Sequence, residues 1–129
     1  MIITSLELSK RLKEAGYPQG NTDFYYVFQR GDWDLYTDCN CDQCWSRYSF
    51  RTKADAPIAE EILEKLPKGV TKDGRLYRLS IDCEQKWMNV CYRDFGTNGK
   101  IHTIGRIEAP TLTEALGLMY LHLKEHNLL

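Results

Sequence analysis

Apolar residues recur at helical spacing near the start of the chain. Leu8 and Leu12 fall on one helix face, and Thr4 and Glu7 have the spacing of a capping box. In such a box each side chain accepts a hydrogen bond from the other residue's backbone N–H. A glycine four residues beyond Leu12 suits the left-handed turn that often ends a helix. The pattern predicts a helix over residues 4–15.

Two later segments have a similar amphipathic spacing. In the first, Pro57 stands in the first turn of the pattern, where a helix needs no backbone N–H. This segment predicts a helix over residues 57–66. The second begins with Thr111 and Glu114, again at the spacing of a capping box, and predicts a helix over residues 111–125. Its apolar stripe consists of Leu112, Ala115, Leu116, Met119, Tyr120 and Leu123.

Strand-forming residues fill much of the chain between these helices. Aromatic and β-branched side chains alternate with polar ones, and turn residues separate the segments. Short turns join neighbouring segments as hairpins, and strands joined in this way are antiparallel. The predicted strands cover residues 24–29, 33–37, 45–51, 75–81, 86–94 and 101–107.

The order of the elements predicts the fold class. Helix, strands, helix, strands and helix follow one another in 129 residues, which is the length of one ordinary domain. Amphipathic helices must bury their apolar faces, and one face of a sheet is the natural place for them. We therefore expect a single α+β domain over residues 1–129, with an antiparallel sheet and three amphipathic helices packed mainly on one face.

Charge and hydropathy narrow the range of partners. The formal net charge is −1, whereas proteins that bind nucleic acid through its phosphates usually have a basic excess, so nucleic acid is not an expected partner. The chain contains no apolar run of about 18 residues, which is the length that a membrane-spanning helix needs. The N-terminus lacks the features of a signal peptide. We expect a cytoplasmic protein without a membrane partner, and a homo-oligomer is left open.

Three of the five cysteines lie within six residues, as Cys39, Cys41 and Cys44. Zinc favours thiolate and imidazole ligands in a closed tetrahedron, so these thiols are candidate metal ligands. The usual zinc signature has two pairs of ligands at C-x2-C spacing, and here only Cys41 and Cys44 form such a pair. A redox role for this pair would need a helix to begin there, but strand-like residues follow. We expect no cofactor, with zinc as the alternative. Candidate fourth ligands are Cys83, Cys91, His102, His122 and His126.

Aromatic residues are concentrated in one part of the chain. Nine of the 15 lie between residues 24 and 50, where they could form a platform for bases, a protein-binding patch or core. Between residues 22 and 50, five aspartates against two arginines make the region acidic, which disfavours nucleic acid. Successive strand residues point to opposite faces, so some rings are expected to be exposed, and exposed Tyr and Trp often anchor protein interfaces. The expected binding residues are Trp33, Tyr36, Trp45 and Tyr48.

Sequence signatures of catalysis are missing. The chain contains no serine elbow, phosphate-binding loop, dinucleotide fingerprint or H-E-x-x-H motif, so an enzyme is the less favoured interpretation. His122 and His126 have the i, i+4 spacing of a metal-binding pair. Histidine is also favoured at a helix C-terminus, and we prefer that explanation for both residues.

Four segments of the sequence resemble segments of known proteins. They are LELSKRLKEAG, APIAEEILEKLP, APTLTEAL and the closing EHNLL. Together they resemble a group of small uncharacterised proteins encoded by bacteriophages and prophages. The resemblance implies a bacterial host cytoplasm and an accessory role, and assigns no functional residue.

The leading hypothesis is a non-enzymatic phage accessory protein that binds a host or phage protein. Its grounds are the missing catalytic set, the balanced charge and the surplus of aromatic residues on acidic strands. One alternative is a protein that binds or sequesters a small, nucleotide-like ligand. Another is a zinc or thiol protein that uses the turn from Cys39 to Cys44.

Overall fold

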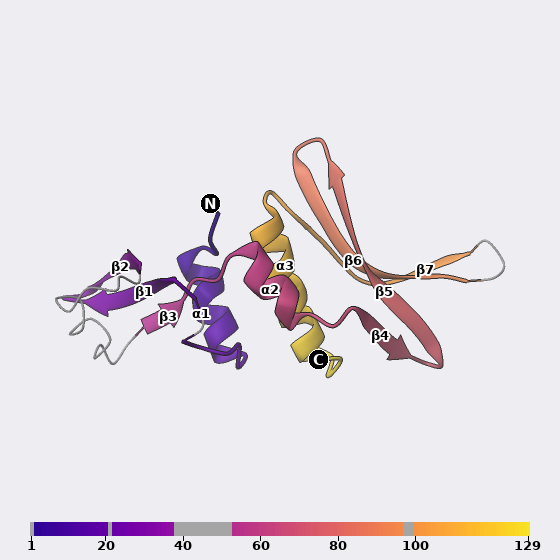
Figure 1. Ribbon diagram of the computed structural model, residues 1–129, viewed down its shortest axis with the longest axis horizontal. Coiled ribbons are helices and arrows are strands. Elements are labelled where there is room, and N and C mark those ends of the chain that lie inside the picture. Colours follow the sequence, from indigo (N-terminus) through magenta and orange to yellow (C-terminus); the bar gives the residue numbers. More distant parts are fainter. Residues whose placement is uncertain (1, 21, 38–52, 97–99) are drawn as a thin grey trace.

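A computed structural model describes residues 2–20, 22–37, 53–96 and 100–129. Its strands form two antiparallel sheets, a three-stranded one in the order β2-β1-β3 and a four-stranded one in the order β4-β5-β6-β7, with the helices between them (Figure 1). The helices are α1 (Leu6–Glu14), α2 (Ala59–Lys65) and α3 (Leu112–Glu125). The strands are β1 (Phe24–Gln29), β2 (Asp32–Thr37), β3 (Lys53–Asp55), β4 (Gly69–Lys72), β5 (Arg75–Glu84), β6 (Trp87–Phe95) and β7 (Ile101–Ala109).

The α+β class and the antiparallel pairing are confirmed, but the expectation of a single sheet is wrong for the described residues. The expected hairpins β1–β2 and β5–β6 do form, yet each belongs to a different sheet. Nor do the three helices share one sheet face. Helix α3 packs on β6 and β7, α1 packs on β3, and α2 packs on α3. Which hairpins pair into one sheet depends on contacts between segments that are distant in the sequence, and local alternation does not reveal these contacts.

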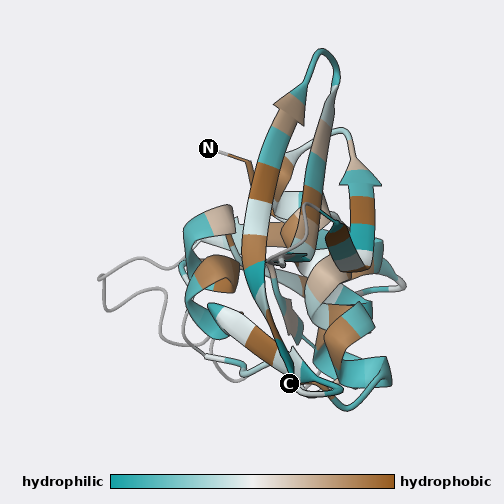
Figure 2. Ribbon diagram, turned by 90° about the vertical axis from the view of Figure 1, so that its right-hand side faces the viewer, coloured by the Kyte–Doolittle hydropathy of each residue, from teal (hydrophilic) through white to brown (hydrophobic). Residues whose placement is uncertain are grey.

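The main core lies between α3 and the four-stranded sheet. Leu116, Met119 and Leu123 are fully buried on α3, and Val90 and Tyr92 are fully buried on β6. Hydrophobic and hydrophilic residues alternate along the strands of this sheet (Figure 2), because successive side chains point to opposite faces. Each such buried apolar side chain contributes about 1.5–3 kcal/mol relative to an exposed one. Leu8 and Leu12 of α1 and Ile62 of α2 belong to the same core cluster.

The first helix begins one residue later than a capping box at Thr4 requires. Ser5 is the N-cap, and its side chain accepts a hydrogen bond from the backbone N–H of Leu8 at 3.3 Å. Thr4 precedes the helix instead. Its N–H donates to the carbonyl of Pro57, and its buried hydroxyl lies 2.6 Å from that of Ser9. The predicted box at Thr4 is therefore wrong, because a bridge to the segment before α2 holds this residue outside the helix.

The other two helices keep part of what the sequence predicts. Helix α2 begins after Pro57 rather than at it, and the carboxylate of Glu61 accepts a hydrogen bond from the N-cap backbone at 3.2 Å. In α3, Thr111 accepts from the N–H of Glu114 at 3.1 Å, as predicted. The Glu114 carboxylate does not close the box and instead accepts from the N–H of Ser5 at 3.0 Å. It thereby joins the start of α3 to the start of α1. Of the helices in the described ranges, none combines the length and apolar character of a membrane span.

Candidate functional site

The predicted aromatic binding site is described only in part. Trp33 and Tyr36 both lie on β2, whereas Trp45 and Tyr48 fall outside the described residues. Trp33 is opposite Phe28 on β1, and Tyr36 is opposite Tyr25. Because an odd number of positions separates Trp33 from Tyr36, the two rings point to opposite faces of the hairpin. The structure therefore does not bring these two predicted site residues together.

On one face of the hairpin, three large side chains form an apolar patch, which we call the hairpin patch: Phe28, Trp33 and Leu35. Phe28 and Leu35 are exposed, and Trp33 is partly buried. The rings of Phe28 and Trp33 are 5.4 Å apart, and the Lys10 ammonium lies 4.7 Å from the centre of the Trp33 ring. Phe28 is 44% exposed and Leu35 is 48% exposed. Neither residue was among the four predicted, although strand alternation places both on the Trp33 face.

Tyr36 packs on the opposite face of the hairpin. Its ring stacks on that of Tyr25 with centroids 6.1 Å apart, and Tyr25 is only 4% exposed. The Lys53 ammonium lies 5.6 Å from the centre of the Tyr25 ring. These contacts give Tyr36 a packing role next to a buried tyrosine, so it is not part of the hairpin patch.

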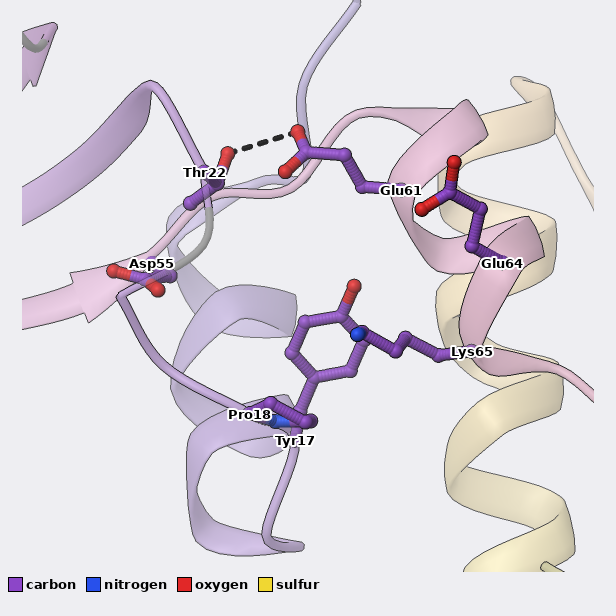
Figure 3. Close-up of a pocket in the computed structure, with 7 residues that line it drawn as sticks. All are labelled: Tyr17, Pro18, Thr22, Asp55, Glu61, Glu64 and Lys65. Carbon is purple, nitrogen blue, oxygen red and sulfur yellow. Dashed lines mark hydrogen bonds between the residues drawn. The ribbon is translucent and has the colours of Figure 1, made fainter.

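A second candidate site is a small pocket between the segment after α1, β3 and α2 (Figure 3). Its cavity volume is about 50 Å³. Three carboxylates and one ammonium group are among its lining groups, and we call it the acidic pocket. It is lined by Tyr17, Pro18, Thr22, Asp55, Glu61, Glu64 and Lys65.

Hydrogen bonds to the backbone and to a hydroxyl hold two of these carboxylates in place. Glu61 accepts from the Thr22 hydroxyl at 2.9 Å (Figure 3) and from the N–H of Ile58 at 3.2 Å. Asp55, which is 3% exposed, accepts from the backbone N–H of Gly20. The third carboxylate, Glu64, lies about one turn beyond Glu61 on α2 and therefore on the same side of the helix.

Tyr17 contributes its hydroxyl to the acidic pocket. The residue is 5% exposed, its ring packs edge-on against Tyr120 with centroids 4.9 Å apart, and its hydroxyl points toward Glu61 and Glu64 (Figure 3). Burial raises the pKa of the Tyr17 hydroxyl well above its usual value, and the nearby charge of Glu61 raises it further. The group is therefore a neutral phenol. No hydrogen bond within the described part of the chain uses this hydroxyl.

Comparison with protein-family models, curated proteins and solved structures finds no match for this chain. Each candidate site is therefore judged on the chemistry of its own residues. The carboxylates of the acidic pocket attract cations and repel anions. A nucleotide-like ligand would bring its phosphates against Asp55, Glu61 and Glu64, so this pocket does not favour the nucleotide form of the small-ligand hypothesis.

The candidate zinc ligands Cys39, Cys41 and Cys44 lie outside the described residues, and both the expectation of no cofactor and the zinc alternative stay predictions. Within the described ranges, no three residues among His, Cys, Asp and Glu are grouped as a metal site requires. His126 is the C-cap of α3, and its Nδ1 lies 2.8 Å from the carbonyl oxygen of His122. That contact agrees with the predicted role of this histidine at the helix end.

The acidic pocket is not among the sites predicted from the sequence. Asp55 lies outside the predicted strands, but it ends β3 and pairs with Tyr25. Glu61 and Glu64 lie within the helix predicted over residues 57–66. Their spacing of three residues was the available signal, since it places two carboxylates on one side of α2. The approach of Tyr17 to that side depends on tertiary packing.

Proposed function

We propose that this protein is a non-enzymatic phage accessory protein that binds a host or phage protein in the bacterial cytoplasm, and that the hairpin patch is its docking surface. One observation carries the proposal. Phe28 and Leu35 are 44% and 48% exposed beside Trp33 on a single face of the hairpin. Large apolar side chains gathered on a surface are typical of protein interfaces. The resemblance of the sequence to phage and prophage proteins supports the cellular setting.

The charge on the patch face comes from Lys10, whose ammonium lies 4.7 Å from the centre of the Trp33 ring. Asp32 and Asp34 are exposed on β2, but they alternate with Trp33 and therefore point to the opposite face of the hairpin. Interfaces commonly combine an apolar centre with a polar rim, and Lys10 supplies a polar group beside this apolar centre. Nucleic acid stays the less favoured occupant because the formal net charge of the chain is −1.

Two matched leucine variants test the proposal. Leu35 and Leu76 are 48% and 50% exposed, and they lie on β2 and β5 of the two different sheets. Wild type, Leu35→Ser and Leu76→Ser are each immobilised and exposed to the same bacterial lysate, and the affinity of any retained protein is then measured. We expect a partner that binds wild type and Leu76→Ser alike, and Leu35→Ser at least about 10-fold more weakly, as for an interface anchor.

The outcome against the proposal is equally specific. If Leu35→Ser binds every retained protein as tightly as Leu76→Ser does, the hairpin patch is not the docking surface. Melting curves of both variants are the control for folding, since half-exposed leucines should not affect stability strongly. A concentration-dependent dimer of wild type that Leu35→Ser abolishes would identify a second copy of the chain as the occupant and would overturn the proposal of a foreign partner.

A further inference from the structure

We infer that the acidic pocket is a binding site for a cationic group, either an alkylammonium or a guanidinium. The site lies between β3, α2 and the segment after α1, and it does not include any residue of the hairpin patch. The inference is therefore independent of the proposed docking surface. It stands on the charge of the lining, on the Tyr17 hydroxyl, which no hydrogen bond among the described residues uses, and on the size of the pocket.

Charge is the first argument. Asp55, Glu61 and Glu64 bring three carboxylates to the lining, and Lys65 brings one ammonium. Glu61, Glu64 and Lys65 take part in none of the ion pairs formed among the described residues. The excess of carboxylates over ammonium groups makes the lining acidic, so it attracts a cation.

The Tyr17 hydroxyl is the second, independent argument. Tyr17 is only 5% exposed. Its hydroxyl points into the pocket (Figure 3) and has no hydrogen-bond partner among the described residues. This hydroxyl is therefore available to a ligand that enters the pocket. The phenol oxygen can accept a hydrogen bond from a cation whose other N–H groups donate to Glu61 and Glu64. Ammonium and guanidinium groups carry several donors and no acceptor, which matches this set of oxygens.

Size is the third argument. The pocket has a cavity volume of about 50 Å³. This volume holds a few waters or one polar head group, since one water needs about 10–15 Å³ of such volume. The pocket is too small for a base or a sugar, so the occupant is the terminal group of a longer molecule. Such a group belongs either to a free alkylamine or to a lysine or arginine side chain of a partner protein.

Titrations with defined probes test this inference. The backbone amides of the protein are followed by NMR while N-acetyl-arginine amide, 1,4-diaminobutane or the neutral isostere N-acetyl-citrulline amide is added. We expect both cations to shift the amides of residues that line the pocket, with a Kd of about 1 mM or tighter for the better probe, and to weaken as salt is added. Tighter binding of the arginine derivative indicates a partner side chain, and tighter binding of the diamine indicates a free amine.

Variants show whether the lining groups are responsible. Glu64→Gln should weaken binding of the cation about fivefold, whereas Glu84→Gln, at the exposed end of β5 and outside the lining, should leave it unchanged. Tyr17→Phe keeps the ring packed on Tyr120 and should weaken binding about threefold. Lys65→Gln removes a competing cation and should strengthen it. Equal shifts with the neutral isostere, no shifts at 10-fold the expected Kd, or equal effects of Glu64→Gln and Glu84→Gln would overturn the inference.

Discussion

Gly105 and His122 approach so closely that a Cβ atom at position 105 would lie 2.9 Å from Cδ2 of the imidazole ring. Gly105 has a φ of 63° and sits where the register between β6 and β7 shifts, between the partners of Val90 and Tyr92. Two residues of β7 there face one residue of β6, which is a β-bulge. The contact of β7 with α3 therefore depends on a position without a side chain.

Replacing this glycine should destabilise the domain for two separable reasons. Gly105→Ala meets both an unfavourable left-handed backbone and the clash with His122, and we expect a loss of about 2–4 kcal/mol of unfolding free energy. Gly74→Ala is the matched control, because Gly74 has a φ of 76° and no atom within 4 Å of a Cβ placed there. It should lose about 1–2 kcal/mol. Urea unfolding measures both, and equal losses would show that the approach of His122 carries no cost.

The buried hydroxyls of Thr4 and Ser9 provide a second prediction. Both residues are fully buried and their oxygens are 2.6 Å apart. Ser9→Ala leaves the Thr4 hydroxyl without its partner and should cost about 1–3 kcal/mol. The double variant Thr4→Val/Ser9→Ala removes both groups and should be nearly as stable as wild type. A double-mutant cycle by urea unfolding checks this, and additive losses from the single variants would contradict it.

Part of the fold could be predicted because its signals are local. The strand over residues 24–29 has those bounds in the structure, and the one over 86–94 is shifted by one residue at each end, since alternation and strand-forming residues are properties of the segment itself. Strands β3 and β4 were missed because three or four residues carry no measurable period. The division into two sheets was missed because it depends on pairings between distant segments.

The candidate sites show the same division between local and long-range information. The position of Trp33 on a partly exposed strand followed from the sequence, and the opposite facing of Tyr36 could have been derived from strand alternation. The acidic pocket could not be derived, because it needs Tyr17, Asp55 and Glu61 to meet from three separate segments. Its two glutamates on α2 were visible, but nothing local indicates which groups approach them.

The pH dependence of stability should carry a contribution from His122. Burial lowers the pKa of His122 below its ordinary value of 6.5, and His126 and Lys72 lower it further while Glu125 acts in the opposite direction. The folded protein therefore binds a proton at His122 less readily than the unfolded chain does. The resulting stability is fully present above pH 6.5 and is lost as the pH falls through the lowered pKa.

A substitution at His122 isolates this contribution from that of the carboxylates. Urea midpoints of wild type and His122→Gln are compared at about pH 7.5 and about pH 5, on either side of the histidine range. We expect wild type to lose more stability between these two values than His122→Gln does. The same loss in both proteins would mean that protonation of His122 costs the folded state nothing.

The last prediction concerns Trp33, because the docking proposal requires this ring to lie at the surface and not in the core. Its contacts with the Phe28 ring and the Lys10 ammonium should together contribute about 1–2 kcal/mol. We therefore expect Trp33→Ala to remain folded and to lose no more than that amount. Tyr92→Ala is the comparison, since Tyr92 is fully buried and its hydroxyl donates to the Pro67 carbonyl at 2.7 Å.

Truncating a core ring of this kind should cost about 3–5 kcal/mol, so urea unfolding distinguishes the two positions before any partner is known. A Trp33→Ala protein as unstable as Tyr92→Ala would place the Trp33 ring in the core. Phe28 and Leu35 would then surround a structural tryptophan. The hairpin patch would lose its tryptophan, a residue type that is enriched among interface anchors. A stable Trp33→Ala protein that still loses its partner would instead make Trp33 the centre of the docking surface.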